Sequence, residues 1–125
     1  MEIQLSEHAP QYSIRGIFQH NDQFQFKIGE KLVDYPVILH PEGVIPWELE
    51  NPPQIQQQDL LPLLGLGVEL VILGTGKSQI FPEFSVTSPI LKANLGLEIM
   101  DSPAACRTYN LLLGDDRKVA VALLI

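Results

Sequence analysis

The first third of the chain alternates hydrophobic and polar residues with the two-residue period of a β-strand. Residues 23–28 (QFQFKI) place both phenylalanines and the isoleucine on one side, which is typical of a half-buried strand. Residues 12–19 (YSIRGIFQ) alternate in part, and residues 20–22 (HND) between the two segments form a turn cluster. The pattern therefore predicts an antiparallel hairpin.

A short apolar run and a proline-rich stretch follow. Residues 36–40 (PVILH) predict a short strand, whereas prolines interrupt residues 41–53 (PEGVIPWELENPP) and predict a loop. Trp47 lies in this stretch. We expect its ring to cover the core, because large aromatic side chains are usually buried, with a binding platform as the alternative.

The second half of the chain has longer apolar segments. Residues 56–67 (QQQDLLPLLGLG) predict a short helix that ends near Gly65 or Gly67, and Pro62 limits its length. Residues 68–74 (VELVILG) form an apolar run with β-branched residues. Such a run is typical of a strand that is buried on both faces.

Two later helices are expected to begin alike, each at a serine-proline pair. The pair at residues 88 and 89 precedes ILKANL, and Gly96 is expected to end this helix. The pair at residues 102 and 103 precedes AACRTYNLLL, and Gly114 is expected to end that helix. Serine caps a helix start, proline suits the first helical position, and glycine adopts the left-handed turn at the end.

Strands are expected after these helices, at residues 97–100 (LEIM) and 118–125 (KVAVALLI). The order β-α-β-α-β predicts an α/β fold with a mixed, mostly parallel sheet flanked by helices. The length of 125 residues is that of one domain, so residues 1–125 are expected to form a single unit.

Composition and charge exclude several classes of protein. The net charge is −7, and because a duplex-binding protein needs a basic face, we expect no nucleic-acid partner. The apolar runs are too short for a membrane span, and the N-terminus lacks a signal or transit pattern. One cysteine excludes an internal disulfide. We therefore expect a cytoplasmic protein. The three histidines are too widely spaced to suggest a metal site, and no cofactor is expected.

Residues 74–78 (GTGKS) resemble the end of a nucleotide-binding P-loop. A P-loop needs a glycine where Val71 stands and a helix that begins at the lysine, which Pro82 opposes. The glycines alternatively let the chain turn sharply away from a buried strand. A third interpretation places a ligand here, because open α/β sheets bind ligands beyond the carboxyl ends of their strands.

The third interpretation joins the Gly-Thr-Gly turn to the start of the helix at Ser102. That helix start would offer free amides and a partial positive charge. Arg107 and Lys77 would add to this charge. The sequence thus predicts a crevice for a small anion or a carboxylate.

Cys106 falls in the first turn of the same predicted helix. A helix N-terminus lowers the pKa of a thiol, but a cysteine nucleophile also needs a base. All three histidines lie in the β-rich half, so we expect no catalytic residue. The alternative for Cys106 is a small buried apolar side chain.

Several segments together match a known family: VIPW, VELVILGTG, the Phe-Pro pair at residues 81 and 82, and LGLEIMDSPAACRTYNLLLGDDRKVAVALL. On these segments the chain resembles the Mth938-like, or DUF498, domain proteins. The resemblance implies a three-layer fold. A central mixed sheet would have helices on one side, and a β-hairpin layer with another helix on the other.

The resemblance supplies no established reaction, and the family includes a mitochondrial assembly factor for respiratory complex I. Matched positions without an assigned role make up the candidate pocket: Gly74, Thr75, Gly76, Asp101, Arg107, Thr108 and Asn110.

Two functions follow from the sequence. The first is a non-enzymatic binding or assembly protein that holds a partner polypeptide through an apolar patch rimmed by acidic charge. The alternative is a protein or enzyme that binds a small anionic metabolite at the predicted crevice. Either function is compatible with a monomer or a homodimer.

Overall fold

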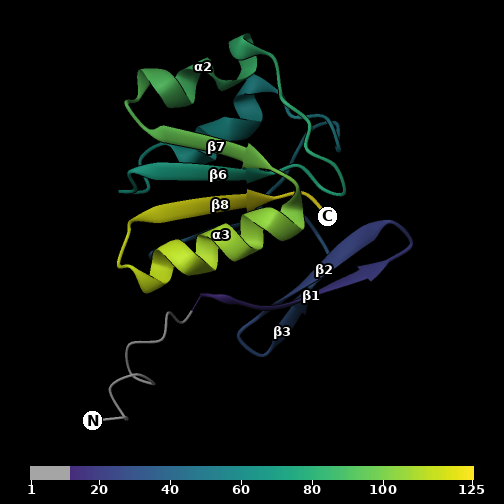
Figure 1. Cartoon of the computed structure of the whole chain (residues 1–125). Coiled ribbons are helices and arrows are strands. Elements are labelled where there is room, and N and C mark those ends of the chain that lie inside the picture. The colour runs from purple at the N-terminus through teal and green to yellow at the C-terminus, as the bar shows by residue number, and fades with distance from the viewer. Residues whose placement is uncertain (1–11) are drawn as a thin grey trace.

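The computed structural model describes residues 12–125, which form two β-sheets and three helical segments (Figure 1). The strands are β1 (Ile14–His20), β2 (Gln23–Ile28), β3 (Lys31–Val33), β4 (Val37–His40), β5 (Gly43–Pro46), β6 (Leu70–Gly74), β7 (Gly96–Met100) and β8 (Val119–Leu123). The helical segments are the 3₁₀-helix η1 (Gln57–Leu63) and the α-helices α2 (Phe84–Lys92) and α3 (Ser102–Gly114).

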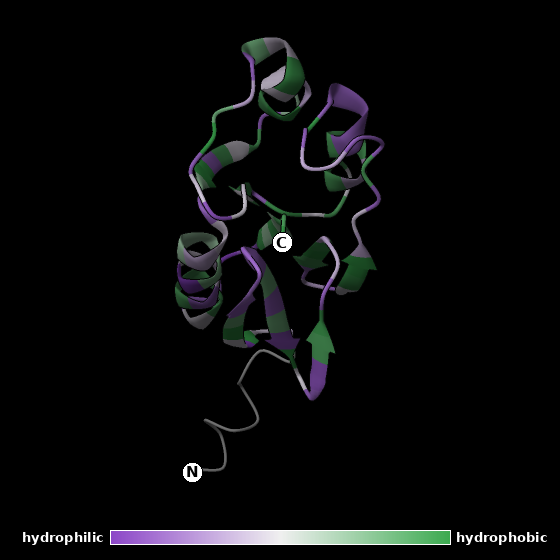
Figure 2. Ribbon diagram, turned by 90° about the vertical axis from the view of Figure 1, so that its right-hand side faces the viewer, coloured by the Kyte–Doolittle hydropathy of each residue, from purple (hydrophilic) through white to green (hydrophobic). Residues whose placement is uncertain are grey.

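The three N-terminal strands form a small antiparallel sheet in the order β1-β2-β3. The predicted hairpin is confirmed, and Asn21 and Asp22 turn it with φ angles of 52° and 64°. Hydrophobic and hydrophilic positions alternate along its strands, as the stripes in Figure 2 show. Phe24 and Phe26 are buried, and their stacked rings lie 6.4 Å apart between centroids.

The larger sheet has five strands in the order β5-β4-β8-β6-β7. Strands β6, β7 and β8 run parallel to one another, whereas β4 pairs antiparallel with both β5 and β8. The predicted β-α-β-α-β order is therefore confirmed as β6-α2-β7-α3-β8. Helices α2 and α3 supply the crossovers that parallel strands require.

Both faces of the five-stranded sheet are covered. Helix α3 and the small sheet pack on one face, where Ile72 of β6 joins their core. Helices η1 and α2 pack on the other face, where Val71 and Leu73 point. Strand β6 is apolar throughout because its side chains alternate between these two cores.

The predicted loop over residues 41–53 is partly wrong. Residues Gly43–Pro46 form β5, an edge strand that pairs antiparallel with β4. Pro46 ends the strand at the sheet edge, where a missing amide disrupts no central ladder. The prediction for Trp47 is confirmed, since it is 3% exposed and its Nε1 donates to the Asp59 backbone oxygen at 2.8 Å.

The predicted start of α2 is wrong. The helix begins at Phe84, with Glu83 as its N-cap, and contains Pro89. A proline here leaves the carbonyl of Ser85 without its usual helical donor. Gln57 of η1 fills that place, because its Nε2 donates to the Ser85 oxygen at 2.9 Å. The predicted end is also wrong, since Gly96 opens β7.

The other two helical segments differ from prediction mainly at their ends. Segment η1 is a 3₁₀-helix that ends at Leu63, before either predicted glycine. Helix α3 begins at Ser102 as predicted, but its cap is Asp101, whose Oδ1 accepts from the Ala104 amide at 2.8 Å. Gly114 is its last residue, as expected, and the positive φ of 58° falls at Asp116.

Candidate functional site

Ser102 joins the two places where the sequence predicts a ligand crevice. Its amide donates to the Gly76 oxygen at 2.8 Å, and its hydroxyl accepts from the Gly76 amide at 2.8 Å. The same hydroxyl donates to the Leu124 oxygen at 2.6 Å. The Gly-Thr-Gly turn and the start of α3 are therefore neighbours, as predicted, but they bond directly to each other.

Close packing fills the space between these two places. A Cβ atom on Gly74 would lie 2.8 Å from Leu123 Cδ2, 3.0 Å from Ser102 Oγ and 3.1 Å from Ala105 Cβ. Real Cβ atoms do not approach their neighbours so closely, so Gly74 serves the contact between β6 and α3. Gly76 has a φ angle of 87°, which favours glycine, in agreement with the sharp turn predicted as one alternative.

The expectation of free amides at the start of α3 is corrected. The amides of Ser102, Ala104 and Ala105 donate to Gly76 O, Asp101 Oδ1 and Asp101 O respectively. The remaining residue of this turn is a proline, which has no amide hydrogen. Every donor of the first turn thus has an acceptor within the chain.

The other predicted site residues lie farther along α3. Arg107 is exposed, and Thr108 Oγ1 lies 3.4 Å from Met100 Sδ. Asn110 holds strand β1, because its Oδ1 accepts from the Ile14 amide at 2.9 Å and its Nδ2 donates to the Ile14 oxygen at 2.7 Å. A ligand-binding role for these residues stays a prediction.

Lys77, which was expected to add positive charge, forms an ion pair with Asp22 of the hairpin turn. The two charged atoms lie 3.2 Å apart, and both side chains are mostly exposed. Exposed pairs of this kind stabilise a protein by less than about 1 kcal/mol. No helix follows Lys77 before α2, as the failed P-loop pattern predicts.

Cys106 is a buried core residue. Burial raises the pKa of its thiol to about 12, an effect that exceeds the opposing one of the Arg107 charge. The buried apolar alternative therefore describes this residue, because burial outweighs the lowering of the thiol pKa expected at a helix N-terminus. Burial likewise raises the pKa of Tyr109, whose hydroxyl has no hydrogen-bond partner within residues 12–125.

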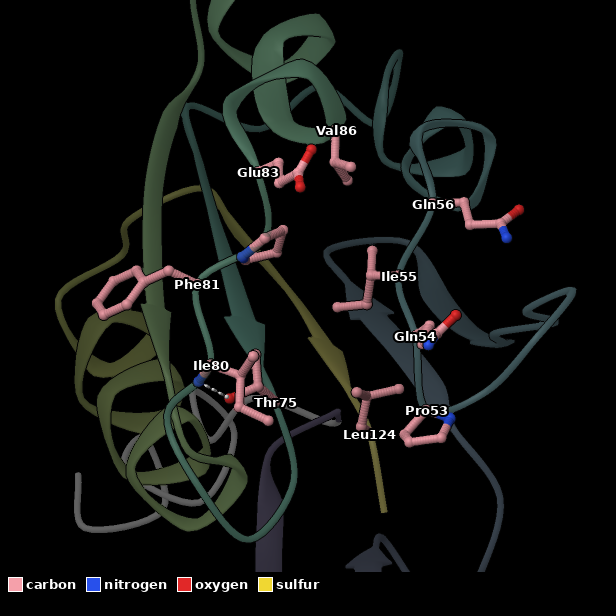
Figure 3. Close-up of a pocket in the computed structure, with 11 residues that line it drawn as sticks. Pro53, Gln54, Ile55, Gln56, Thr75, Ile80, Phe81, Glu83, Val86 and Leu124 are labelled. Carbon is pink, nitrogen blue, oxygen red and sulfur yellow. Dashed lines mark hydrogen bonds between the residues drawn. The ribbon is translucent and has the colours of Figure 1, made fainter.

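A pocket of about 410 Å³ opens on the opposite face of the sheet, at the carboxyl ends of β6 and β8 (Figure 3). This volume falls in the range of natural ligand pockets, about 300–1,000 Å³. Ile55 and Ile80 come from opposite walls, Leu124 lies at the base, and Val86 belongs to the first turn of α2. The remaining lining residues are Pro53, Gln54, Gln56, Thr75, Phe81, Pro82 and Glu83.

Thr75 positions one wall of this pocket. Its side-chain oxygen accepts from the Ile80 amide at 3.0 Å, shown as a dashed line in Figure 3. The hydroxyl donates to backbone oxygens, with Oγ1 at 2.5 Å from the Ser78 oxygen and 3.2 Å from the Met100 oxygen. Thr75 is the one predicted site residue that lines the pocket, and its hydroxyl is committed to these internal bonds.

Asp59 positions the opposite wall. It is 3% exposed, and its carboxylate accepts from the Gln56 amide at 2.8 Å and the Glu50 amide at 3.4 Å. These bonds hold the segment that carries Ile55. Sequence reasoning missed Asp59, although its place three residues after Gln56 is the spacing of a capping box.

Exposed apolar side chains lie along the segment that forms one wall of the pocket and leads into α2. Ile80, Phe81 and Phe84 are 62%, 67% and 72% exposed; we call these three residues the apolar rim. Figure 3 shows the Phe81 ring projecting from its segment on the side away from Ile55. Among the described residues that line the pocket, Glu83 alone is charged.

Two features are absent from the described part of the chain. Within residues 12–125, no three residues among His, Cys, Asp and Glu come together as a metal-binding group. In the same part of the chain, the helices are too short or too polar for any of them to cross a membrane.

The fold is a three-layer α/β domain with the architecture that the resemblance implies. Helices η1 and α2 cover one face of the mixed sheet, and α3 with the hairpin sheet covers the other. A family described as "Protein of unknown function (DUF498/DUF598)" matches residues 18–124, and the chain belongs to this family.

Relatives and a solved structure agree with this assignment. The 13 kDa major membrane protein of Francisella tularensis subsp. holarctica (strain LVS) is 30% identical over 104 residues, which are 82% of this chain and 83% of that protein. NADH dehydrogenase (ubiquinone) 1 alpha subcomplex assembly factor 3 of Danio rerio is 29% identical over 101 residues, 79% of this chain. The match spans 58% of the zebrafish protein. A solution NMR structure of a Mth938-like domain from Bordetella pertussis superposes with a TM-score of 0.73 at 25% identity, covering 92% of this chain and 86% of that chain.

Proposed function

We propose that this chain is a non-enzymatic assembly factor that binds a partner polypeptide over the pocket and the apolar rim. The observation that carries the proposal is the exposure of Ile80, Phe81 and Phe84 beside a pocket that is itself mostly apolar. Exposed apolar patches next to a hollow are characteristic of binding surfaces. Aromatic side chains at such a surface supply much of the binding energy.

The similarity to an assembly factor supports the same function. The zebrafish relative is named as an assembly factor for NADH dehydrogenase, and such a protein acts by binding other polypeptides. The internal use of Thr75 and Ser102 also supports a binding role, because neither hydroxyl is free to act on a substrate. We propose the cytoplasm as its location, in keeping with a single, buried cysteine.

The proposal is tested by quantitative co-purification of the tagged full chain from cells of its own source. We expect the double variant Phe81→Ser, Phe84→Ser to lose partner proteins that the unmodified chain recovers. A matched control is Phe18→Ser with Leu111→Ser, because these side chains are 49% and 69% exposed and lie outside the pocket lining. Recovery of the same partners by both double variants would contradict the proposal.

A further inference from the structure

We propose that the pocket receives an apolar segment of the partner that carries a lysine or arginine, and that Glu83 pairs with this basic side chain. The inference rests on the proposed protein-binding function and names the chemistry of the partner. It follows from the shape of the pocket, from its charge, and from the hydrogen-bond donors beside the wall that carries Ile55.

The shape of the pocket suits large apolar side chains of a polypeptide. Ile55, Ile80, Val86 and Leu124 surround it, and the bonds of Thr75 and Asp59 each fix the backbone of one wall. A pocket formed before binding costs little ordering when an apolar anchor enters it. The apolar rim then extends the contact beyond the anchored side chain.

The negative charge at the pocket favours a partner that has a basic residue next to its apolar anchor. Glu83 is the N-cap of α2, but its side chain makes no capping hydrogen bond. The ion pairs formed within residues 12–125 do not include it. With a net charge of −7, the chain repels acidic segments and attracts basic ones.

The wall of the pocket that carries Ile55 suits a peptide backbone. The side-chain oxygens of Gln54 and Gln56 accept from Asn51 and Gln58, at 3.0 and 2.7 Å. The Nε2 donors of these two residues make no hydrogen bond in the described part of the chain. Both side chains stand on the outer side of the wall that carries Ile55 (Figure 3). A peptide that leaves the pocket over this wall meets two amide donors for its carbonyl groups.

Selection from a random short-peptide library on the purified full chain tests the inference. We expect the selected peptides to be enriched in lysine or arginine next to large apolar residues. The tightest peptide should shift the NMR amide signals of Ile55, Ile80 and Val86. Its affinity should fall by up to about fivefold with Glu83→Gln, the upper end of the range measured for exposed charge pairs, and it should also fall in high salt.

Glu98→Gln is the matched control, because Glu98 is an exposed carboxylate on β7 outside the pocket lining. It should leave the affinity unchanged. Selected peptides without basic enrichment, equal affinity for Glu83→Gln and the unmodified chain, or the absence of any pocket-binding peptide would each overturn the inference. Concentration-dependent shifts of the pocket amides without peptide would assign this face to a second copy and also overturn it. None of these results alters the co-purification test of the apolar rim, so the two proposals fail separately.

Discussion

The hydroxyl of Ser102 donates a 2.6 Å hydrogen bond to the backbone oxygen of Leu124 while it accepts from the Gly76 amide. Ser102 is fully buried. One side chain thus ties the start of α3 to the ends of two neighbouring strands. This closes the sheet edge on the α3 side, while the pocket stays open on the side of η1 and α2.

Replacing Ser102 should destabilise the fold. Ser102→Ala leaves a buried amide and a buried carbonyl without their partner, and each such loss costs about 1–3 kcal/mol. We expect the free energy of unfolding, measured by urea denaturation, to fall by about 2 kcal/mol or more. Ser85→Ala, at an exposed serine of α2, should change it by less than about 0.5 kcal/mol. Equal stability of the two variants would show that the Ser102 bonds contribute nothing.

Two glycines of the same fold should respond in opposite ways to alanine. Gly74→Ala places a methyl group 2.8 Å from a Leu123 methyl, and overpacking of this kind costs about 1–3 kcal/mol. Gly114→Ala meets no atom within 4 Å at the end of α3, and alanine favours the helix by up to about 1 kcal/mol. Thermal unfolding of both variants measures the difference. A Gly74→Ala variant as stable as the parent would contradict the packing argument.

Asn110 should hold the first strand against α3. Asn110→Ala removes both of its bonds to Ile14, residues separated by 96 positions. We expect the Ile14 amide to exchange its hydrogen at least tenfold faster, because a loss of about 1.4 kcal/mol corresponds to that factor. The rate of amide hydrogen exchange in β6 should change less. Leu111→Ala, at an exposed neighbouring position, is the control and should leave the Ile14 amide unaffected.

The Cys106 thiol should be inert in the folded protein. Burial raises its pKa from 9.0 to about 12, so little thiolate forms at pH 8 and a thiol reagent should react only after unfolding. The same pKa shift also makes the stability of the fold depend on pH. The unfolded chain loses this proton near pH 9 while the folded chain keeps it, so stability falls as the pH rises from 9 toward 12. Cys106→Ala should lessen this alkaline loss, with Tyr109 contributing the rest; rapid labelling of the native protein would contradict the burial.

Predictions succeeded where the signal was local and failed where a distant residue decided the outcome. The alternation of residues 23–28 identified β2, and the apolar run before Gly74 identified β6. The Ser-Pro pair at residues 88 and 89 suggested a helix start, yet the helix runs through it. Gln57, more than twenty positions earlier, supplies the donor that Pro89 lacks. No local pattern contains that information.

The sequence likewise predicted only part of the candidate site. The sequence placed Thr75 at the carboxyl end of a buried strand, where ligand sites form, and Thr75 does line the pocket. The sequence also predicted a ligand crevice at the start of α3, but the Ser102 side chain occupies the space between that helix start and the Gly-Thr-Gly turn. Glu83 gave no signal that distinguished it from a surface carboxylate, and the capping-box spacing of Asp59 indicates a helix start but not a pocket wall.

The sequence by itself determined the hairpin, the buried strands and the start of α3, because side-chain period, turn residues and prolines act on their immediate neighbours. Only the tertiary structure decided which face of the sheet opens into a pocket. Its walls come from segments near residues 55, 80 and 124, and the packing of side chains far apart in the chain determines whether the space between them is filled.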